Sequence, residues 1–181
     1  YKELIKHGYP LVSMSLSIMI MNLSDRFYIE SMLNINETGI YSIGAIIGGI
    51  ELIVVNAVMG VLRPLIYKSL KVKKNTFNLQ LLNLIILVFT AFCILLPLDL
   101  IYYFLDESYS ASKVYVLPIV IGFIFWGIYN FYISYFIYNK NTKSIAIISI
   151  TGVILNLILN YYFIHSYQTI GAAYATTLTY F

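Results

Sequence analysis

The sequence predicts an all-α fold, a polytopic bundle of about six transmembrane helices. Of its 181 residues, 60% are hydrophobic and only 10% are charged, and the mean hydropathy is +0.83. Soluble domains carry about 25% charged residues. Long apolar runs also recur along the chain, with short polar connections between them. A water-soluble fold could not bury this much apolar surface, so we expect lipid to be part of the solvent.

The apolar runs have the length that a membrane helix needs, which is about 20 residues. The expected spans are residues 8–31, 39–62, 77–101, 114–138, 144–164 and 170–181. Because the apolar residues are consecutive rather than alternating, helices are favoured over a β-barrel. We expect one transmembrane domain over residues 1–181. The chain begins at Tyr1 and ends at Phe181 inside an apolar run, so we expect it to be a fragment of a longer protein.

The distribution of basic residues predicts the orientation of the bundle, because lysine and arginine collect in cytoplasmic loops. Nine of the 11 basic residues lie on the side of the amino terminus: Lys2, Lys6, Arg63, Lys68, Lys71, Lys73, Lys74, Lys140 and Lys143. Only Arg26 and Lys113 lie on the other side. We therefore expect the amino terminus in the cytoplasm. The net charge of +3 then forms a collar facing inward, so it does not predict a nucleic-acid partner.

Residue combinations typical of enzymes are missing from the sequence. No cluster of His, Cys and Asp has the spacing of a metal site, and no Gly-rich loop ends in Gly-Lys-Ser or Gly-Lys-Thr. The single cysteine, Cys93, lies inside an apolar run. We therefore expect no metal, no cofactor other than a coupling Na⁺ or H⁺, and no enzymatic activity.

Asp25 and Arg26 interrupt the first apolar run near its outer end, in the stretch NLSDRFYIESM of residues 22–32. One interpretation is that they mark the membrane boundary, where Arg26 reaches toward the headgroups and Asp25 is hydrated. The other interpretation is a functional role, which a resemblance given below makes specific.

Glu51 lies near the middle of the second expected span, where an ionisable side chain is costly and indicates a functional site. Gly44, Gly48 and Val55 share its helical face. Small residues let another helix approach closely, so we expect this face to be buried in protein or to line a cavity. Glu51 is then either a hydrogen-bonded packing residue or a carboxylate that binds a coupling cation or a proton.

Asn156 and Asn160 form a polar stripe with Gly152 on the fifth expected span, since side chains four residues apart lie on one side of a helix. Amides in hydrocarbon need partners, so the stripe faces other helices or water. It either joins helices or contacts sugar hydroxyls. Asn56, in the second span, and Asn83, near the start of the third, are further candidates for a substrate or ion pathway.

Aromatic rings crowd the fourth expected span, and Trp126 lies close to its middle, with Tyr129 about one turn further. Tyr and Trp usually collect at the membrane interfaces, so these rings either pack helices together or stack on sugars. Arg63, beside Pro64 at the cytoplasmic end, either holds a pyrophosphate by paired hydrogen bonds or serves orientation and attraction to anionic lipids.

Three segments resemble bacterial polysaccharide flippases, the Wzx-type exporters of the multidrug/oligosaccharidyl-lipid/polysaccharide superfamily. The first is Asp25-Arg26 at the end of a helix, followed by the Gly-x-Tyr-Ser of residues 39–42. The second is RPLIYKSL of residues 63–70, which is similar to the Pro-x-x-Tyr-Lys turn of the family. The third is an Asn-x-x-x-Asn helix followed by Gly-Ala-Ala-x-Ala-Thr, within residues 155–180, although the loop HSYQT between them lacks the proline that the family often has.

The resemblance covers the chain in order and implies the carboxyl-terminal lobe of a MATE/MurJ-like transporter with two lobes. Such a transporter flips undecaprenyl-pyrophosphate-linked oligosaccharide, as in O-antigen and lipopolysaccharide synthesis, to the outer leaflet of the bacterial cytoplasmic (inner) membrane by alternating access. The implied partners are this lipid-linked oligosaccharide, membrane lipid, the amino-terminal lobe of the same chain, and polysaccharide polymerase or assembly proteins. Asn22, Asp25 and Arg26 would form an outer gate.

Two other functions stay open at this point. A cation-coupled multidrug exporter of the same superfamily would also use a mid-membrane acid such as Glu51. A membrane-embedded polysaccharide polymerase or acyltransferase would need a sizeable soluble loop or a charged catalytic cluster. The longest outer connection, residues 102–113, offers acids and one lysine but no histidine.

Overall fold

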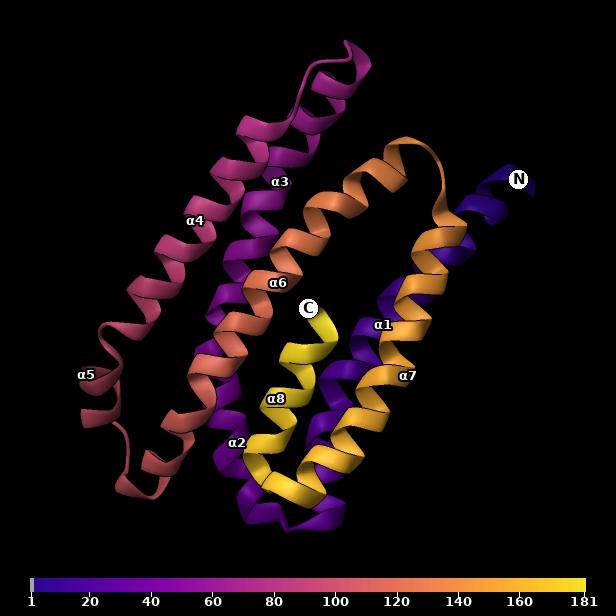
Figure 1. Cartoon of the computed structure of the whole chain (residues 1–181). Helices are drawn as coiled ribbons and strands as arrows, with labels where there is room; N and C mark the ends of the chain where they lie inside the picture. Colours follow the sequence, from indigo (N-terminus) through magenta and orange to yellow (C-terminus); the bar gives the residue numbers. More distant parts are fainter. Residues whose placement is uncertain (1) are drawn as a thin grey trace.

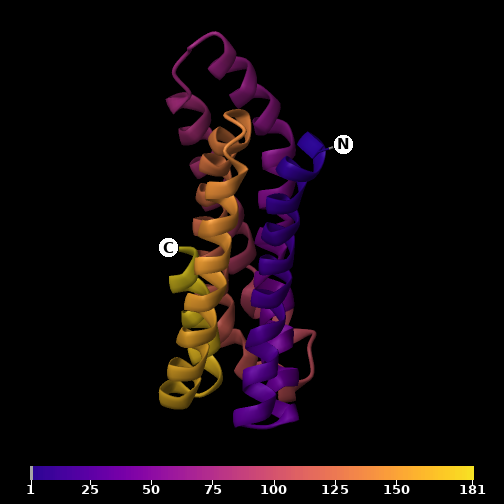
Figure 2. The ribbon, with the colours of Figure 1, turned by 90° about the vertical axis from the view of Figure 1, so that its right-hand side faces the viewer.

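The protein is an elongated bundle in which every regular element of residues 2–181 is helical (Figures 1 and 2). The computed structural model describes the backbone of residues 2–181 and the side chains of residue 12 and of residues 15–181. The elements are α1 (Lys2–Met32), α2 (Ile35–Gly48), α3 (Ile50–Lys71), α4 (Phe77–Leu95), α5 (Leu98–Tyr103), the 3₁₀ helix η1 (Glu107–Ser112), α6 (Lys113–Tyr138), α7 (Thr142–Tyr167) and α8 (Thr169–Tyr180). The expected all-α fold is confirmed.

Four segments of the described chain are long and apolar enough to cross a membrane. They are Ile35–Lys71, Phe77–Tyr103, Glu107–Tyr138 and Thr142–Tyr167. These segments contain the second to fifth expected spans. Helices α1 and α8 cover most of the first and sixth expected spans but are not among the four segments, so a count of six spans stays a prediction.

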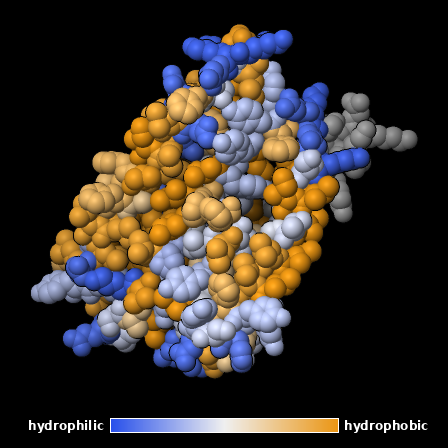
Figure 3. Space-filling view, viewed as in Figure 1, coloured by the Kyte–Doolittle hydropathy of each residue, from blue (hydrophilic) through white to orange (hydrophobic). Residues whose placement is uncertain are grey.

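The surface has the polarity that such a bundle needs. Hydrophobic residues cover the flank that α4 forms in Figure 3, where Ile85, Val88, Phe89 and Phe92 are exposed. Hydrophilic residues gather at the two ends of the bundle instead, at the α3–α4 turn and around η1. An apolar belt between polar ends is the arrangement that a bilayer accommodates.

The second expected span, residues 39–62, differs from the prediction because it consists of two helices. Gly49 separates α2 from α3, and its carbonyl accepts a hydrogen bond from the Leu52 N–H over 3.0 Å, which makes a turn tighter than an α-helix. A Cβ on Gly48 would lie 2.7 Å from Ile119 Cγ2 of α6, and one on Gly44 would lie 2.7 Å from the Ser112 carbonyl oxygen. The close approach predicted for these two glycines is therefore confirmed, and their partners are α6 and the end of η1.

Helix α6 is the centre of the bundle and contacts α2, α3, α4 and α8. Gly127 of α6 faces Leu87 of α4 and Val55 of α3, and no side chain would fit between the three helices there. In lipid, the hydrophobic effect does not hold helices together, so close van der Waals packing of this kind has to contribute instead.

Helices α1, α7 and α8 form the other side of the bundle, with α1 beside α7 and α8 folded back between α7 and α6 (Figure 1). Gln168 makes the turn from α7 to α8 with φ 58° and ψ −144°. A Cβ on Gly171 would lie 2.7 Å from the Ile164 backbone nitrogen, so this glycine lets α8 start directly against α7. The turn thereby brings polar residues of both helices to α1.

Candidate functional site

Asp25 is the centre of a buried polar network that joins four helices. It lies on α1, its side chain is only 6% exposed, and its carboxylate accepts three hydrogen bonds. The Tyr41 hydroxyl of α2 and the Thr176 hydroxyl of α8 each donate to Oδ2 over 2.9 Å, and the Asn160 amide of α7 donates to Oδ1 over 2.8 Å. The hydrated position expected of a boundary residue therefore does not hold for Asp25.

Neutral donors alone compensate for the Asp25 charge by direct contact. Among the residues that the structure describes, the only ion pair joins Lys113 and Asp99. Although Arg26 follows Asp25 in sequence, its Nε donates to the Ser42 hydroxyl over 3.1 Å instead. A buried carboxylate without a cationic partner is costly unless its hydrogen bonds are complete, so the position of all four helices matters to this site.

The two asparagines of α7 extend the network along the helix. Asn156 and Asn160 are fully buried, and the Asn160 amide lies 3.1 Å from Asn156 Oδ1. The Ser24 hydroxyl also donates to Asn156 Oδ1, over 2.8 Å, and the Asn156 amide donates to the Thr179 hydroxyl over 3.3 Å. The asparagine stripe thus contacts α1 and α8, as expected of residues that join helices.

One acceptor in this network has no partner. Asn160 Oδ1 is buried and makes no hydrogen bond within the described part of the chain. Turning the amide over would place this oxygen against the carboxylate of Asp25, so the observed orientation is the favourable one. The amide nitrogen faces the carboxylate, so this oxygen points away from Asp25 and is left as an unused acceptor.

A cavity of about 270 Å³ opens beside Asp25, and the three outer-gate candidates, Asn22, Asp25 and Arg26, all line it. Tyr41 and Thr176 add hydroxyl groups, and Leu52 and Phe123 add apolar wall. Gly49, at the break between α2 and α3, is also part of the wall. Broken helices at cavities are typical of ion and substrate sites in transporters.

Oxygen ligands dominate this site, which decides what it could hold. Carboxylate, amide and hydroxyl oxygens are the ligands that hard cations prefer. Asp25, Asn160 and Thr176 offer all three kinds within one network. No group of three or more His, Cys, Asp and Glu side chains that could hold a metal ion occurs among the described residues.

Glu51 lies elsewhere, at the contact between α3 and α4. It is fully buried, and the Thr90 hydroxyl lies 3.1 and 3.0 Å from its two carboxyl oxygens. It lines neither the cavity at Asp25 nor the pocket at Trp126. The face that carries Gly44 and Gly48 continues to Val55, which packs against Gly127 of α6, while the carboxyl group of Glu51 meets Thr90 of α4. The structure therefore favours the packing interpretation of Glu51.

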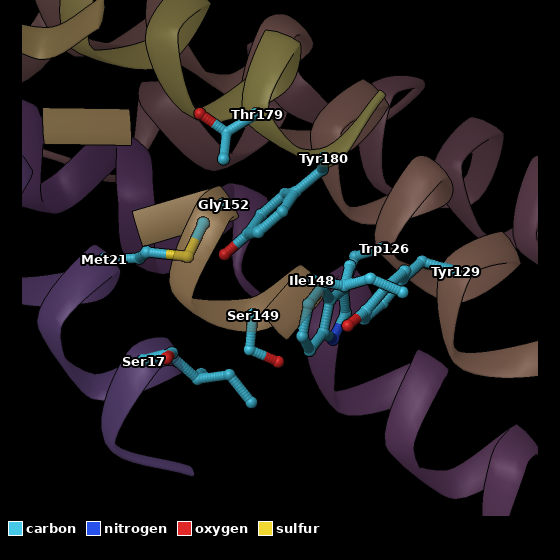
Figure 4. A pocket seen from close by; sticks show the side chains of 10 residues that line it. Ser17, Met21, Trp126, Tyr129, Ile148, Ser149, Gly152, Thr179 and Tyr180 are labelled. Carbon is cyan, nitrogen blue, oxygen red and sulfur yellow. The ribbon is translucent and has the colours of Figure 1, made fainter. Parts of the chain in front are cut away.

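Trp126 and Tyr129 line a second pocket, of about 60 Å³, between α1, α6, α7 and α8 (Figure 4). The Trp126 ring packs against Tyr129 and Tyr180, with centroid distances of 5.1 and 5.0 Å. The rings pack helices together and also line a pocket, and stacking on sugars stays a prediction.

The remaining candidates are dispersed. Asn83 is 2% exposed and its amide lies 3.4 Å from the Gly127 carbonyl oxygen, while its own Oδ1 has no partner within the described residues. Asn56 lies on the exposed face of α3. Arg63 is half-buried on α3, and its Nε is buried without a hydrogen-bond partner in the described part of the chain. None of the three lines either pocket.

Sequence reasoning missed three sets of partners as site residues: Tyr41 and Thr176, which donate to Asp25, Ser24 and Thr179, which bond to Asn156, and Thr90, which bonds to Glu51. Hydroxyl residues are common in membrane helices, and their role depends on which helices meet. The one available signal was that Tyr41 and Thr176 fall inside the segments that carry the family resemblance. A scan of family models and searches of curated proteins and of solved structures found no match to this chain.

Proposed function

We propose that this chain is one lobe of a transporter that flips lipid-linked oligosaccharide across the bacterial cytoplasmic membrane. One observation carries the proposal: the first and the third of the segments that resemble the polysaccharide flippases are far apart in sequence and converge on one site. Asp25 and Tyr41 come from the first segment and Asn160 and Thr176 from the third, and all four share hydrogen bonds on a single carboxylate. The adjoining Arg26 contacts Ser42 of the Gly-x-Tyr-Ser segment in the same way.

The proposed site combines an ion-binding group with a movable contact between helices. Asp25, Asn160 and Thr176 would hold a coupling Na⁺ or H⁺, in the role first considered for Glu51. Binding a cation would redirect the donors that now point at the carboxylate, and those donors come from α2, α7 and α8. An ion can shift a conformational equilibrium only through such a difference in contacts between two states. Asn22, Asp25 and Arg26 act as the outer gate in this scheme.

The proposed transporter has the orientation and the partners that the sequence analysis expects. The lysine-rich end lies in the cytoplasm with the amino terminus, where Arg63 contacts the pyrophosphate or lipid phosphate. The second lobe of the same chain completes the pathway, and polysaccharide polymerase or assembly proteins act next to it. The proposed function does not involve nucleic acid.

The test uses the full-length transporter in a bacterial strain that lacks its own flippase, with surface polysaccharide as the readout and membrane level as the control for expression. We expect the wild type to restore polysaccharide and Asp25→Asn to lower it at least about tenfold, because a neutral side chain loses the ion site and a barrier raised by about 1.4 kcal/mol already slows a step tenfold. Glu51→Gln is the matched variant, which removes a buried acid outside the site and should retain export. A well-expressed wild type that restores nothing would contradict the proposal.

A cation-coupled multidrug exporter is the second candidate, and the composition of the cavity favours it in one respect. Asp25 and Phe123 line the same cavity, and a carboxylate beside an aromatic ring suits organic cations. Drug resistance conferred by the full-length protein, lost in Asp25→Asn, would support this function in place of the first.

A further inference from the structure

The pocket at Trp126 is a recess whose wall includes three aromatic rings. Trp126 packs between Tyr129 and Tyr180, and Figure 4 shows the three rings gathered on one side of the pocket. Trp126 is only 8% exposed, so its position is fixed by its neighbours. Aromatic faces held in this way offer a rigid surface for the carbon–hydrogen groups of a ligand.

Hydroxyl groups add polar surface to the recess. Ser17 of α1, Ser149 of α7 and Thr179 of α8 line it, and Figure 4 shows Ser149 beside Trp126 and Thr179 beside Tyr180. The Thr179 hydroxyl accepts a hydrogen bond from Asn156 and thereby connects the recess to the Asp25 network. A ligand group in the recess therefore meets aromatic rings and hydroxyl groups at once.

The size of the recess restricts what fits. The recess, of about 60 Å³, is much smaller than the cavity of about 270 Å³ at Asp25, so it suits a side group of a few atoms better than a whole pyranose ring. A hydroxymethyl group would leave the aromatic rings without a matching partner. An acetamido group matches both kinds of lining residue, because its methyl group can pack on the aromatic rings and its carbonyl and N–H can bond to the hydroxyl groups.

Building on the proposed function, we infer that this recess receives the acetamido group of an N-acetylated sugar in the lipid-linked oligosaccharide. The methyl group packs on Trp126 and Tyr180, the amide oxygen accepts from a serine hydroxyl, and the pyranose ring stays outside the recess. The recess thereby selects for N-acetylated substrates and, through Thr179 and Asn156, is linked to the ion site.

Gly152 gives a way to fill the recess without disturbing the fold. It lines the pocket, and a Cβ on it would have no atom within 4 Å outside its own helix. A Cβ on Gly60 of α3 would have equally free space, and this glycine lies on an exposed face away from both pockets. Leucine is a better helix former than glycine at both positions, so Gly152→Leu and Gly60→Leu form a matched pair.

The experiment measures binding of two probes to the purified full-length transporter in lipid nanodiscs. One probe is undecaprenyl-pyrophosphate-N-acetylglucosamine, and the other carries glucose, which has a hydroxyl in place of the acetamido group. We expect the wild type and Gly60→Leu to prefer the acetylated probe about tenfold, the contribution of one buried methyl group and one hydrogen bond. Gly152→Leu should bind both probes within about twofold of each other, at the affinity of the wild type for the glucose probe.

Two results separate this inference from the proposed function. Equal binding of both probes by the wild type, or an unchanged preference in Gly152→Leu, would overturn the inference and leave flipping untouched. Failure of the folded wild type to bind either probe would overturn both.

Discussion

Asp25 and Glu51 are both buried carboxyl groups, and their hydrogen-bond partners separate their roles. Asp25 receives hydrogen bonds from side chains of three other helices, so both of its carboxyl oxygens are bound. Glu51 has one hydroxyl near it, and that hydroxyl also lies 3.0 Å from the Ile86 carbonyl oxygen. A threonine hydroxyl has one proton. If Glu51 carries its own proton, it donates to Thr90, and Thr90 then donates to the carbonyl oxygen.

The contact between Glu51 and Thr90 predicts that glutamine, a neutral residue of the same shape, can take the place of Glu51 with little change in stability. Glu51→Gln keeps a donor for Thr90 and should unfold at nearly the same temperature as the wild type. Glu51→Ala removes the contact between α3 and α4 and leaves a void, at a cost of about 2–4 kcal/mol. Thermal unfolding of the full-length protein in detergent measures both. Equal destabilisation by Gln and Ala would mean that the carboxyl group is ionised in place.

At this scale the sequence predicts which polar residues matter better than it predicts what they contact. Asp25, Asn156 and Asn160 are conspicuous because a charge or amide in an apolar run must find partners. Their partners lie up to 151 positions away in the chain, at distances that only the packing of α8 against α7 and α1 determines. Spacing along one helix could not reveal them.

Interruptions of the helices show where sequence patterns lose their predictive value at the scale of elements. Gly44 and Gly48 predict close packing from sequence, and the structure confirms it for both, but α2 ends at Gly48 and α3 begins at Ile50, which the sequence did not predict. An apolar run looks the same whether the helix is continuous or broken. Glu51 contacts Thr90 of α4 and lines neither pocket, and its place in the apolar run does not reveal this.

The α7–α8 turn supports a prediction about stability. Gln168 has φ 58° and ψ −144°, a conformation that glycine adopts readily and other residues adopt at a cost of about 1–3 kcal/mol. Gln168→Gly should therefore stabilise the protein by about 1 kcal/mol, after the greater freedom of glycine in the unfolded chain is counted. Thermal unfolding measures the change. Gln80→Gly, inside α4, is the control and should destabilise, and a loss of stability in Gln168→Gly would contradict the strained turn.

Charge separates the two ends of the whole molecule. The α3–α4 turn carries exposed Lys71, Lys73 and Lys74, whereas the end around η1 carries Asp106 and Glu107 (Figure 3). Hydrogen bonds from the Ser108 side chain and backbone hold the pKa of Asp106 below its usual value, so this end stays anionic to lower pH. Lysine-rich ends face the cytoplasm, which gives the bundle one expected direction in the membrane.

Cysteine labelling in intact cells tests that direction. In the full transporter, with Cys93 and any further cysteine replaced by serine, Glu107→Cys and Lys74→Cys place one thiol at each end of the bundle. A membrane-impermeant maleimide should label Glu107→Cys in intact cells and Lys74→Cys only after permeabilisation, because each thiol is exposed at its own end. The reverse pattern would place the Asp25 cavity on the cytoplasmic side. The gate proposed for Asn22, Asp25 and Arg26 would then close the entrance for substrate rather than its exit.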